Sequence, residues 1–200
     1  MLSLIGYLRL AAAHPRFLAF GFTLSFAGSV GQTVIIGAFG PEVRGEFGLS
    51  HTYWGAIYMA GTLASAVILP WTGQLIDRYP LRLFSFWVCI GLVVAAAFMA
   101  AVPTAVLLIV AIFLLRQMGQ ALANHTATTA TARYLHADRG KGLALVTLGD
   151  AAGKALVPLF AVFAIAAVGW RATYGGMAAV LAFGILPLVL WLLRPFESQL

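Results

Sequence analysis

Long apolar stretches alternate with short polar ones along the whole chain. A membrane-spanning helix needs about 20 mostly apolar residues, because each residue advances a helix by about 1.5 Å across a hydrocarbon core of about 30 Å. Six segments meet this requirement, at approximately 17–39, 51–71, 83–102, 104–134, 142–168 and 172–193. The fourth exceeds one bilayer thickness, so we expect it to tilt or protrude. The pattern predicts an all-α, polytopic membrane protein with six transmembrane helices.

The composition agrees with that pattern. Of the 200 residues, 62% are hydrophobic and only 9% are charged, and the mean hydropathy is +0.97. Soluble domains are usually about 45–50% apolar and about 25% charged, so this chain does not fit that class. The net charge of +6 is better explained by basic loops at a membrane than by nucleic-acid binding. The single cysteine, Cys89, can form no intrachain disulfide and no metal cluster, and we expect no cofactor.

The polar segments divide the chain into a leader, a bundle and a tail. The leader, residues 1–16, lacks the residue order of a cleaved signal peptide, and its residues Ile5 and Leu8 would share one face of a short interfacial helix. Residues 17–194 would form the six-helix bundle. Residues 195–200 are expected to be a cytoplasmic tail that begins a linker to a second half.

Basic residues gather on one side of the predicted spans. If the N-terminus is cytoplasmic, eight arginine and lysine residues lie in inner segments, and only Arg44 and Arg171 lie in outer ones. Cytoplasmic loops carry such an excess of basic residues. We therefore expect a multi-pass protein of the cell (inner or plasma) membrane with both termini in the cytoplasm.

A weak internal repeat relates the two halves of the chain. A shift of 88 positions pairs glycines, glutamines and prolines that shape helices. The pairs are Pro15 with Pro103, Gly31-Gln32 with Gly119-Gln120, Gly61 with Gly149, and Pro70 with Pro158. Transporters are often built from inverted structural repeats. The repeat predicts two inverted three-helix repeats, with the first span matching the fourth and the second matching the fifth.

Three ionisable residues fall inside the predicted spans. Arg116 lies 13 residues after Pro103, about 20 Å along the fourth helix and near the middle of the bilayer. Asp150 and Lys154 are four positions apart on the fifth span, so their side chains can meet. Ionisable residues within a membrane are costly and usually mark substrate or proton pathways. These three residues are therefore the first candidates for function.

Two interpretations of the charged residues remain open. In the functional one, Arg116 binds an anionic group of a solute, and Gln32, Gln120 and Lys154 complete the substrate site. Asp150 would then be the proton-coupling residue. In the structural one, Asp150 pairs with Lys154 or Arg116 only to neutralise charge inside the membrane.

A short charged segment separates the second predicted span from the third. It reads Gly73-Gln74-Leu75-Ile76-Asp77-Arg78-Tyr79-Pro80-Leu81-Arg82. This segment resembles the signature loop of the major facilitator superfamily, roughly G-x-L-a-D-R-x-G-R-R/K, which also lies between the second and third spans. The matching residues are Gly73, Leu75, Asp77, Arg78 and Arg82. Pro80 and Leu81 depart from the pattern.

The resemblance implies a secondary transporter. In that family the charged loop holds two six-helix halves together and governs alternating access, so Gly73, Asp77, Arg78 and Arg82 would form a conformational latch. Family members usually have twelve spans. We expect this chain to be the N-terminal half, working with a second six-helix half that belongs to the same longer chain or to another copy.

Two further sites match the family only in part. Arg116 resembles the arginine of the family's fourth-helix motif, which is often linked to proton coupling, but Gln120 stands where that motif has glycine. Gly149 and Gly153 resemble the fifth-helix antiporter motif, but Lys154 stands where that motif has proline. We therefore do not predict an antiporter, and we expect both glycines to serve close helix packing.

Together these features predict secondary active transport of a small solute by alternating access. The solute would be an organic anion, because Arg116 and Lys154 outweigh Asp150, and the transport would be coupled to protons. The alternative is a membrane scaffold or assembly protein that uses the same fold without transporting. An enzyme is not expected, because the chain has no G-x-S-G motif and no histidine in the fifth or sixth span. The expected partners are the solute, the lipid bilayer and the second half, and not nucleic acid.

Overall fold

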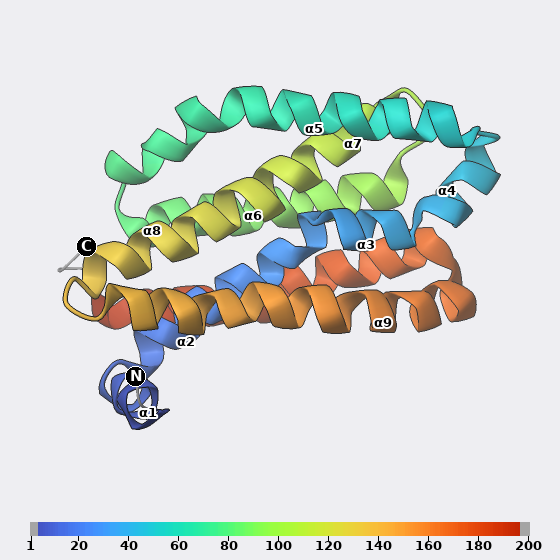
Figure 1. The fold of residues 1–200 in the computed structure, drawn as a ribbon. Coiled ribbons are helices and arrows are strands. Elements are labelled where there is room, and N and C mark those ends of the chain that lie inside the picture. The colour runs from blue at the N-terminus through green and yellow to red at the C-terminus, as the bar shows by residue number, and fades with distance from the viewer. Residues whose placement is uncertain (1–3, 197–200) are drawn as a thin grey trace.

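The computed structural model describes residues 4–196, and these residues form helices joined by short turns (Figure 1). The elements are α1 (Leu4–Ala13), α2 (Pro15–Gly28), η1 (Ser29–Gly31), α3 (Thr33–Ala38), α4 (Gly40–Phe47), α5 (His51–Gly73), η2 (Gln74–Asp77), α6 (Leu81–Ala101), α7 (Leu107–Leu115), η3 (Arg116–Ala123), α8 (Asn124–Tyr134), α9 (Arg139–Val180), η4 (Leu181–Ile185), α10 (Leu186–Leu193) and η5 (Arg194–Phe196). Residues 4–196 contain no strand, so the all-α prediction is confirmed. Most of the predicted tail, residues 197–200, lies outside the described part.

Five helical stretches within residues 4–196 are long and apolar enough to cross a membrane. They are Pro15–Ala38, His51–Asp77, Leu81–Ala101, Leu107–Tyr134 and Arg139–Phe196. The prediction of a multi-pass membrane protein is thereby confirmed. The fourth stretch ends at Tyr134, as the sequence predicts. The segment between the first two spans holds α4, a helix that the hydropathy pattern does not predict.

The fifth of these stretches reverses its direction at Gly169. This glycine has φ 80° and ψ 163°, which side-chain-bearing residues rarely adopt. It divides α9 into a first arm, residues 139–168, and a second arm, residues 170–180, which η4 and α10 continue back along the bundle (Figure 1).

The first and fourth stretches both leave regular α-helical geometry where they cross. In the first, Gln32 has extended backbone (φ −79°, ψ 151°) between η1 and α3. In the fourth, η3 is a π-helix. A Cβ atom on Gly31 would lie 2.1 Å from the backbone oxygen of Leu115, and one on Gly119 would lie 2.8 Å from the backbone nitrogen of Gly31. Only glycine allows the two backbones to approach so closely.

Glycines also bring the fifth stretch against the first. A Cβ on Gly149 would lie 2.2 Å from the backbone oxygen of Phe22, and one on Gly153 would lie 2.4 Å from Ser29 Oγ. The expectation that Gly149 and Gly153 serve close packing is confirmed. Because these contacts fix α2 against the first arm of α9, polar residues from both elements can meet.

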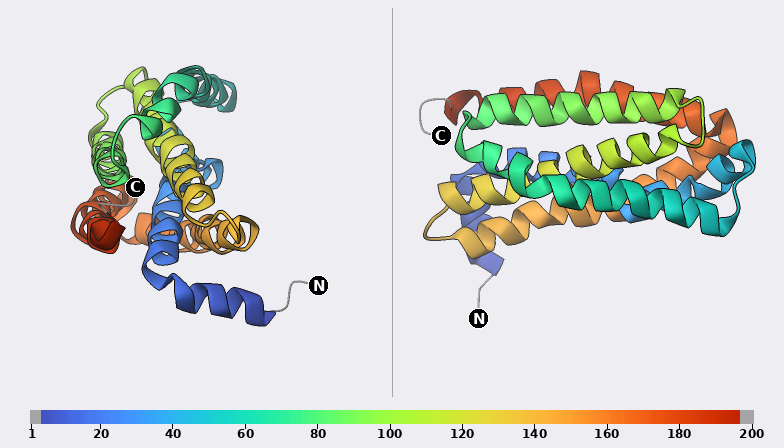
Figure 2. Two further views of the ribbon diagram at one scale, coloured as in Figure 1. Left: turned by 90° about the vertical axis from the view of Figure 1, so that its left-hand side faces the viewer. Right: turned by 90° about the horizontal axis from the view of Figure 1, so that it is seen from above.

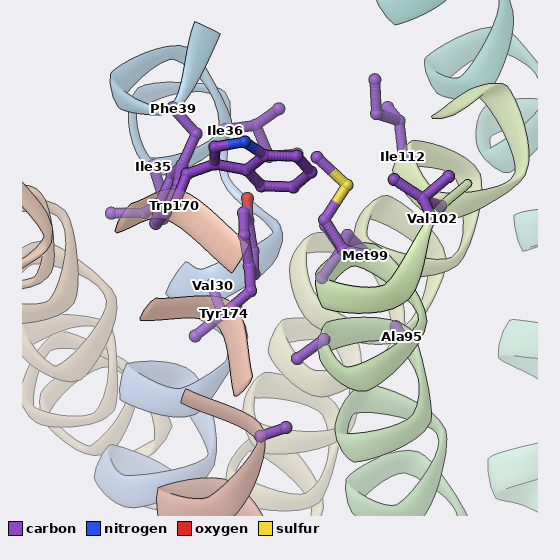
Figure 3. Close-up of a cluster of buried hydrophobic side chains, with 14 of the residues drawn as sticks. Val30, Ile35, Ile36, Phe39, Ala95, Met99, Val102, Ile112, Trp170 and Tyr174 are labelled. Carbon is purple, nitrogen blue, oxygen red and sulfur yellow. The ribbon is translucent and has the colours of Figure 1, made fainter. Parts of the chain in front are cut away.

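Two buried apolar clusters fill the bundle, one toward each end. In the first, Trp170 and Tyr174 of the second arm of α9 point into the bundle beside Met99 of α6 (Figure 3). The Tyr174 ring also packs against Phe39, with centroids 4.1 Å apart. In the second cluster, Phe17 stacks on the Tyr134 ring at 4.1 Å. The two clusters meet at Met118 and Ile185, which pack against both.

The helices form two sides of the molecule. Viewed along the bundle, α5, α8 and the first arm of α9 lie on one side, and α6 and α10 lie on the other (Figure 2, left). Helix α5 is poorly covered: only 17% of its most apolar window is buried. Its exposed large apolar residues include Tyr53, Met59, Leu63, Val67 and Trp71. Of the candidate site residues, Gln32 precedes α3, Arg116 and Gln120 lie on η3, and Asp150 and Lys154 lie on the first arm of α9.

Candidate functional site

Asp150 is the centre of a polar cluster that joins three spans. Its Oδ1 atom accepts hydrogen bonds from Gln32 Nε2 at 3.0 Å and from Asn124 Nδ2 at 3.4 Å. Its Oδ2 atom lies 2.6 Å from Lys154 Nζ, one turn further along α9. The three donors come from the first, fourth and fifth membrane stretches. The carboxylate therefore holds these stretches together through two oxygen atoms.

Arg116 forms a second cluster, in which it contacts no carboxylate. It donates from one terminal nitrogen to Thr33 Oγ1 at 3.1 Å, and its guanidinium lies 5.6 Å from the Tyr58 ring centroid. The Tyr58 hydroxyl also donates to Thr33 Oγ1, at 2.7 Å. Among residues 4–196, no aspartate or glutamate lies within ion-pair distance of Arg116. Its remaining N–H groups can meet an anion from outside.

The two clusters meet at the break in the first span. Gln32 donates to Asp150, and the next residue, Thr33, accepts from Arg116. Because Gln32 is extended, these adjacent side chains can reach different helices. The two clusters are therefore linked through a single peptide bond, between Gln32 and Thr33.

The π-helix η3 carries the candidate residue Gln120, and also Gln117, which attaches η3 to α5. Gln117 accepts from Ser65 Oγ at 2.8 Å and donates to Thr72 Oγ1 at 2.7 Å, which fastens η3 to α5. Gln120 is half-buried, and its Oε1 atom is enclosed without a hydrogen-bond partner in the described chain. Short π-helical segments inside α-helices frequently occur at functional sites. An unpaired amide oxygen beside the crossing with Gly31 is consistent with such a site.

The charges of the two clusters do not cancel. Lys154 and Asp150 neutralise each other at 2.6 Å, so Arg116 leaves the site with a net charge of +1. The Lys154 side chain is 41% exposed and that of Asp150 is 22% exposed. The pair is thus partly accessible from outside the bundle. Both the unpaired cation and the accessible lysine favour an anionic ligand.

The predicted latch residues lie at the end of the bundle that carries both termini (Figure 1). Asp77, at the end of η2, forms an ion pair with Arg133 near the end of α8. Gly73 ends α5, and a Cβ there would lie 3.5 Å from His125 Nε2. Arg78 is exposed after η2, and Arg82 is half-buried in the first turn of α6. The loop is therefore tied to the fourth span, and a groove of about 410 Å³ lies between α5 and α8.

A second set of charged residues closes the opposite end. Glu46 of α4 accepts hydrogen bonds from Arg171 at 2.7 Å and from Trp170 Nε1 at 2.6 Å. Arg171 also donates to the backbone oxygens of Ala100 and Val102, where α6 ends. The hydrogen bond from Arg171 is the largest cause of a Glu46 pKa below its usual value. The set connects α4, α6 and the Gly169 turn.

The sequence identifies the ionisable residues, but not all of their partners. It predicts that Asp150 and Lys154 meet, and they do. It does not predict that Thr33 and Tyr58 would surround Arg116, because neither residue is ionised at neutral pH and the break at Gln32 is hidden in an apolar run. It also misses the pairing of Asp77 with Arg133, which are 56 positions apart in the sequence.

The helical fold, the apolar stretches and the polar clusters within them define a multi-pass membrane protein with ionisable residues inside its membrane stretches. Residues 19–199 match the family model described as Major Facilitator Superfamily. Because the match covers most of the chain, the protein belongs to this family, whose members are membrane transporters of small solutes. Among curated proteins and solved structures, none shows a significant match.

Proposed function

We propose that the chain forms a six-span half of a secondary transporter that moves a small organic anion together with protons. Arg116 carries this proposal, because it is a cation within a membrane stretch with no carboxylate partner among residues 4–196. The six spans are the four stretches before residue 139 and the two arms that meet at Gly169. The matching breaks at Gln32 and in η3 support an arrangement of two inverted three-helix repeats.

The exposure of charged side chains within the membrane stretches supports the proposal that a second half covers them. A lysine or arginine in the hydrocarbon core costs about 2.5–3.5 kcal/mol on insertion scales. Lys154 is 41% exposed, and Arg116 is half-buried. A second six-helix half, from the same longer chain or from another copy, would enclose these charges in a water-filled cavity. The poorly covered α5 would pack against that half.

The anion would bind between the two polar clusters. Arg116 offers a planar set of donors that matches a carboxylate, and Thr33 and Tyr58 fix its orientation. Lys154 adds a second positive charge, and the amides of Gln32 and Gln120 add hydrogen bonds. The net charge of +1 is balanced by one monovalent anion.

Asp150 would couple this binding to protons. A proton on Asp150 would remove its ion pair with Lys154 and weaken its hydrogen bonds with Gln32 and Asn124. It would also raise the charge of the site from +1 to +2 and strengthen anion binding. A proton and a monovalent anion then cross together with no net charge.

The ends of the bundle would set orientation and gating. The end with both termini would face the cytoplasm, across the cell (inner or plasma) membrane. Gly73, Asp77, Arg78 and Arg82 would act as the latch against the second half, and the pair of Asp77 with Arg133 would hold the loop in place. The leader helix α1 lies across the bundle axis and would rest on the membrane surface (Figure 2, left).

Proteoliposomes that contain the chain assembled with its second half, and that enclose a pH-sensitive dye, test the proposal. A panel of small carboxylates is added outside, and acidification of the lumen is followed at zero membrane potential. The wild-type protein should acidify the lumen with at least one carboxylate, and Arg116→Gln and Asp150→Asn should not. Arg44→Gln, which removes one charge outside the spans, is the control and should behave as wild type. Full proton movement by Asp150→Asn would refute the coupling, and no response to any carboxylate would favour a scaffold.

A further inference from the structure

An apolar groove lies between the two arms of α9, apart from the polar clusters. It has a volume of about 490 Å³ and runs between the first arm, the second arm and the adjoining parts of α2, η1 and η4. Val168 and Ala172 line the groove beside the Gly169 turn, and Val30 and Ile185 line its other end. The groove therefore starts at one end of the bundle and stops where η1 and η4 interrupt the helices.

The chemistry of the wall excludes a polar ligand. Thr173 carries the one polar side chain among the lining residues. Its hydroxyl already donates to the backbone oxygen of Gly169 at 2.8 Å. A ligand held along this wall must therefore be apolar over its length, and its polar end must lie beyond the groove.

The length of the groove distinguishes between apolar occupants. The wall of the first arm runs from Val157 to Val168, and the eleven helical rises between these residues extend about 16 Å. One leaflet contributes about 15 Å of a hydrocarbon core that is about 30 Å thick. A transmembrane helix of a partner would need a groove along the full thickness. A groove of one leaflet's depth, which opens at a membrane surface, fits a lipid acyl chain.

We infer that this groove binds one acyl chain of a phospholipid from the leaflet at the Gly169 end. Small residues make room for the chain, among them Ala161, Ala164 and Gly176. Lipid tails and apolar side chains attract each other little within a bilayer, so retention depends on close packing. The acyl chain would fill a space that the side chains leave open and would hold the two arms at a fixed separation.

Two adjacent glycines provide a matched test. A Cβ on Gly176 or on Gly175 would meet no atom within 4 Å, so neither backbone position opposes a side chain. Gly176 lines the groove, whereas Gly175 does not. A leucine at Gly176 would fill the groove, and a leucine at Gly175 would not. A second filling variant, Ala164→Leu, acts from the opposite wall.

Each protein is reconstituted in vesicles of phosphatidylethanolamine and phosphatidylglycerol and extracted in mild detergent. Native mass spectrometry then counts the phospholipids retained, and their mass separates them from free fatty acid and detergent. We expect the fraction with one bound phospholipid to fall about tenfold in Gly176→Leu and Ala164→Leu, and to remain unchanged in Gly175→Leu. Equal retention in all four proteins would overturn the inference, as would capture of fatty acid or detergent alone.

A second experiment uses only the wild-type protein, so it does not depend on whether a variant folds. A phospholipid with a photoreactive group in its acyl chain is cross-linked to the protein, and the cross-linked residues are mapped. In the wild-type protein, cross-links should map to the two arms of α9 around Val157 and Val180. Cross-links spread evenly over exposed helices such as α5 would refute a specific groove. This inference does not depend on the proposed transport, because lipid retention is measured without a solute.

Discussion

The ion pair of Asp150 with Lys154 allows a quantitative test of how the polar cluster contributes to stability. The perturbation is a double-mutant cycle of Asp150→Asn, Lys154→Met and the combined variant. Each single change leaves one charge without its partner, and the combined variant removes both charges. The cycle therefore isolates the interaction between the two residues.

The expected magnitude follows from distance and exposure. The two groups are 2.6 Å apart and the Lys154 side chain is 41% exposed, so water in the cavity that we propose around it screens part of the attraction. We expect a coupling free energy of about 1 kcal/mol, and a cost of about 1–2 kcal/mol for each single variant. The asparagine can still accept from Gln32 and Asn124, so hydrogen bonds worth about 0.6 kcal/mol each are weakened rather than lost.

The assay uses the protein's single cysteine. Cys89 is buried on α6 and reacts with a thiol-sensitive fluorophore only when the bundle opens. Each 1 kcal/mol should lower the unfolding temperature by roughly 2–4 °C for a chain of this size. Asp138 and Lys141 are also 2.6 Å apart, but they lie at the start of α9, and the equivalent cycle there is the control. Additive effects of Asp150→Asn and Lys154→Met, within about 0.5 kcal/mol, would refute the predicted coupling.

Two further predictions concern packing and pH. Gly31→Ala should lower stability by about 1–3 kcal/mol, because its Cβ would lie 2.1 Å from a backbone oxygen, whereas Gly37→Ala, with no atom within 4 Å, should not. Equal unfolding temperatures would refute the predicted close approach. Arg171 lowers the folded-state pKa of Glu46 below the usual value of 4.5. Ionised Glu46 should therefore contribute fully to the stability of the folded protein at neutral pH, and this contribution should be lost as the pH falls below about 4.5. Thermal unfolding from pH 7 to 3 should show a weaker acid dependence in Glu46→Gln, and an unchanged dependence would contradict this linkage.

The sequence predicts the long apolar helices, because membrane crossing imposes a length and an apolar composition that a single helix must satisfy alone. It also predicts the contact of Asp150 with Lys154, because the i, i+4 spacing fixes it within one helix. It cannot predict the partners of Arg116, because Thr33 reaches it only through the break at Gln32. That break lies beside the close approach of Gly31 to the backbone of the fourth span, which no local sequence pattern records.

The sequence also does not predict which charged residues pair at the two ends of the bundle. The basic residues of the loops indicate sidedness, but they do not show that Asp77 pairs with Arg133 or that Glu46 accepts from Arg171. Both pairs join segments that are distant in sequence, and an excess of nearby basic residues offers several equivalent partners. Helix α4 was hidden for a related reason, because its polar residues resemble a loop.

Ligand-dependent stability tests the central claim, that Arg116 binds the anionic group of a solute, most directly. The purified protein is heated at pH 7 with a panel of small carboxylates, each paired with its neutral amide of the same shape. We predict that at least one carboxylate raises the unfolding temperature while its amide does not, and that Arg116→Gln abolishes this rise while Arg44→Gln preserves it. Stabilisation that is equal for acid and amide, or that persists in Arg116→Gln, would contradict the claim.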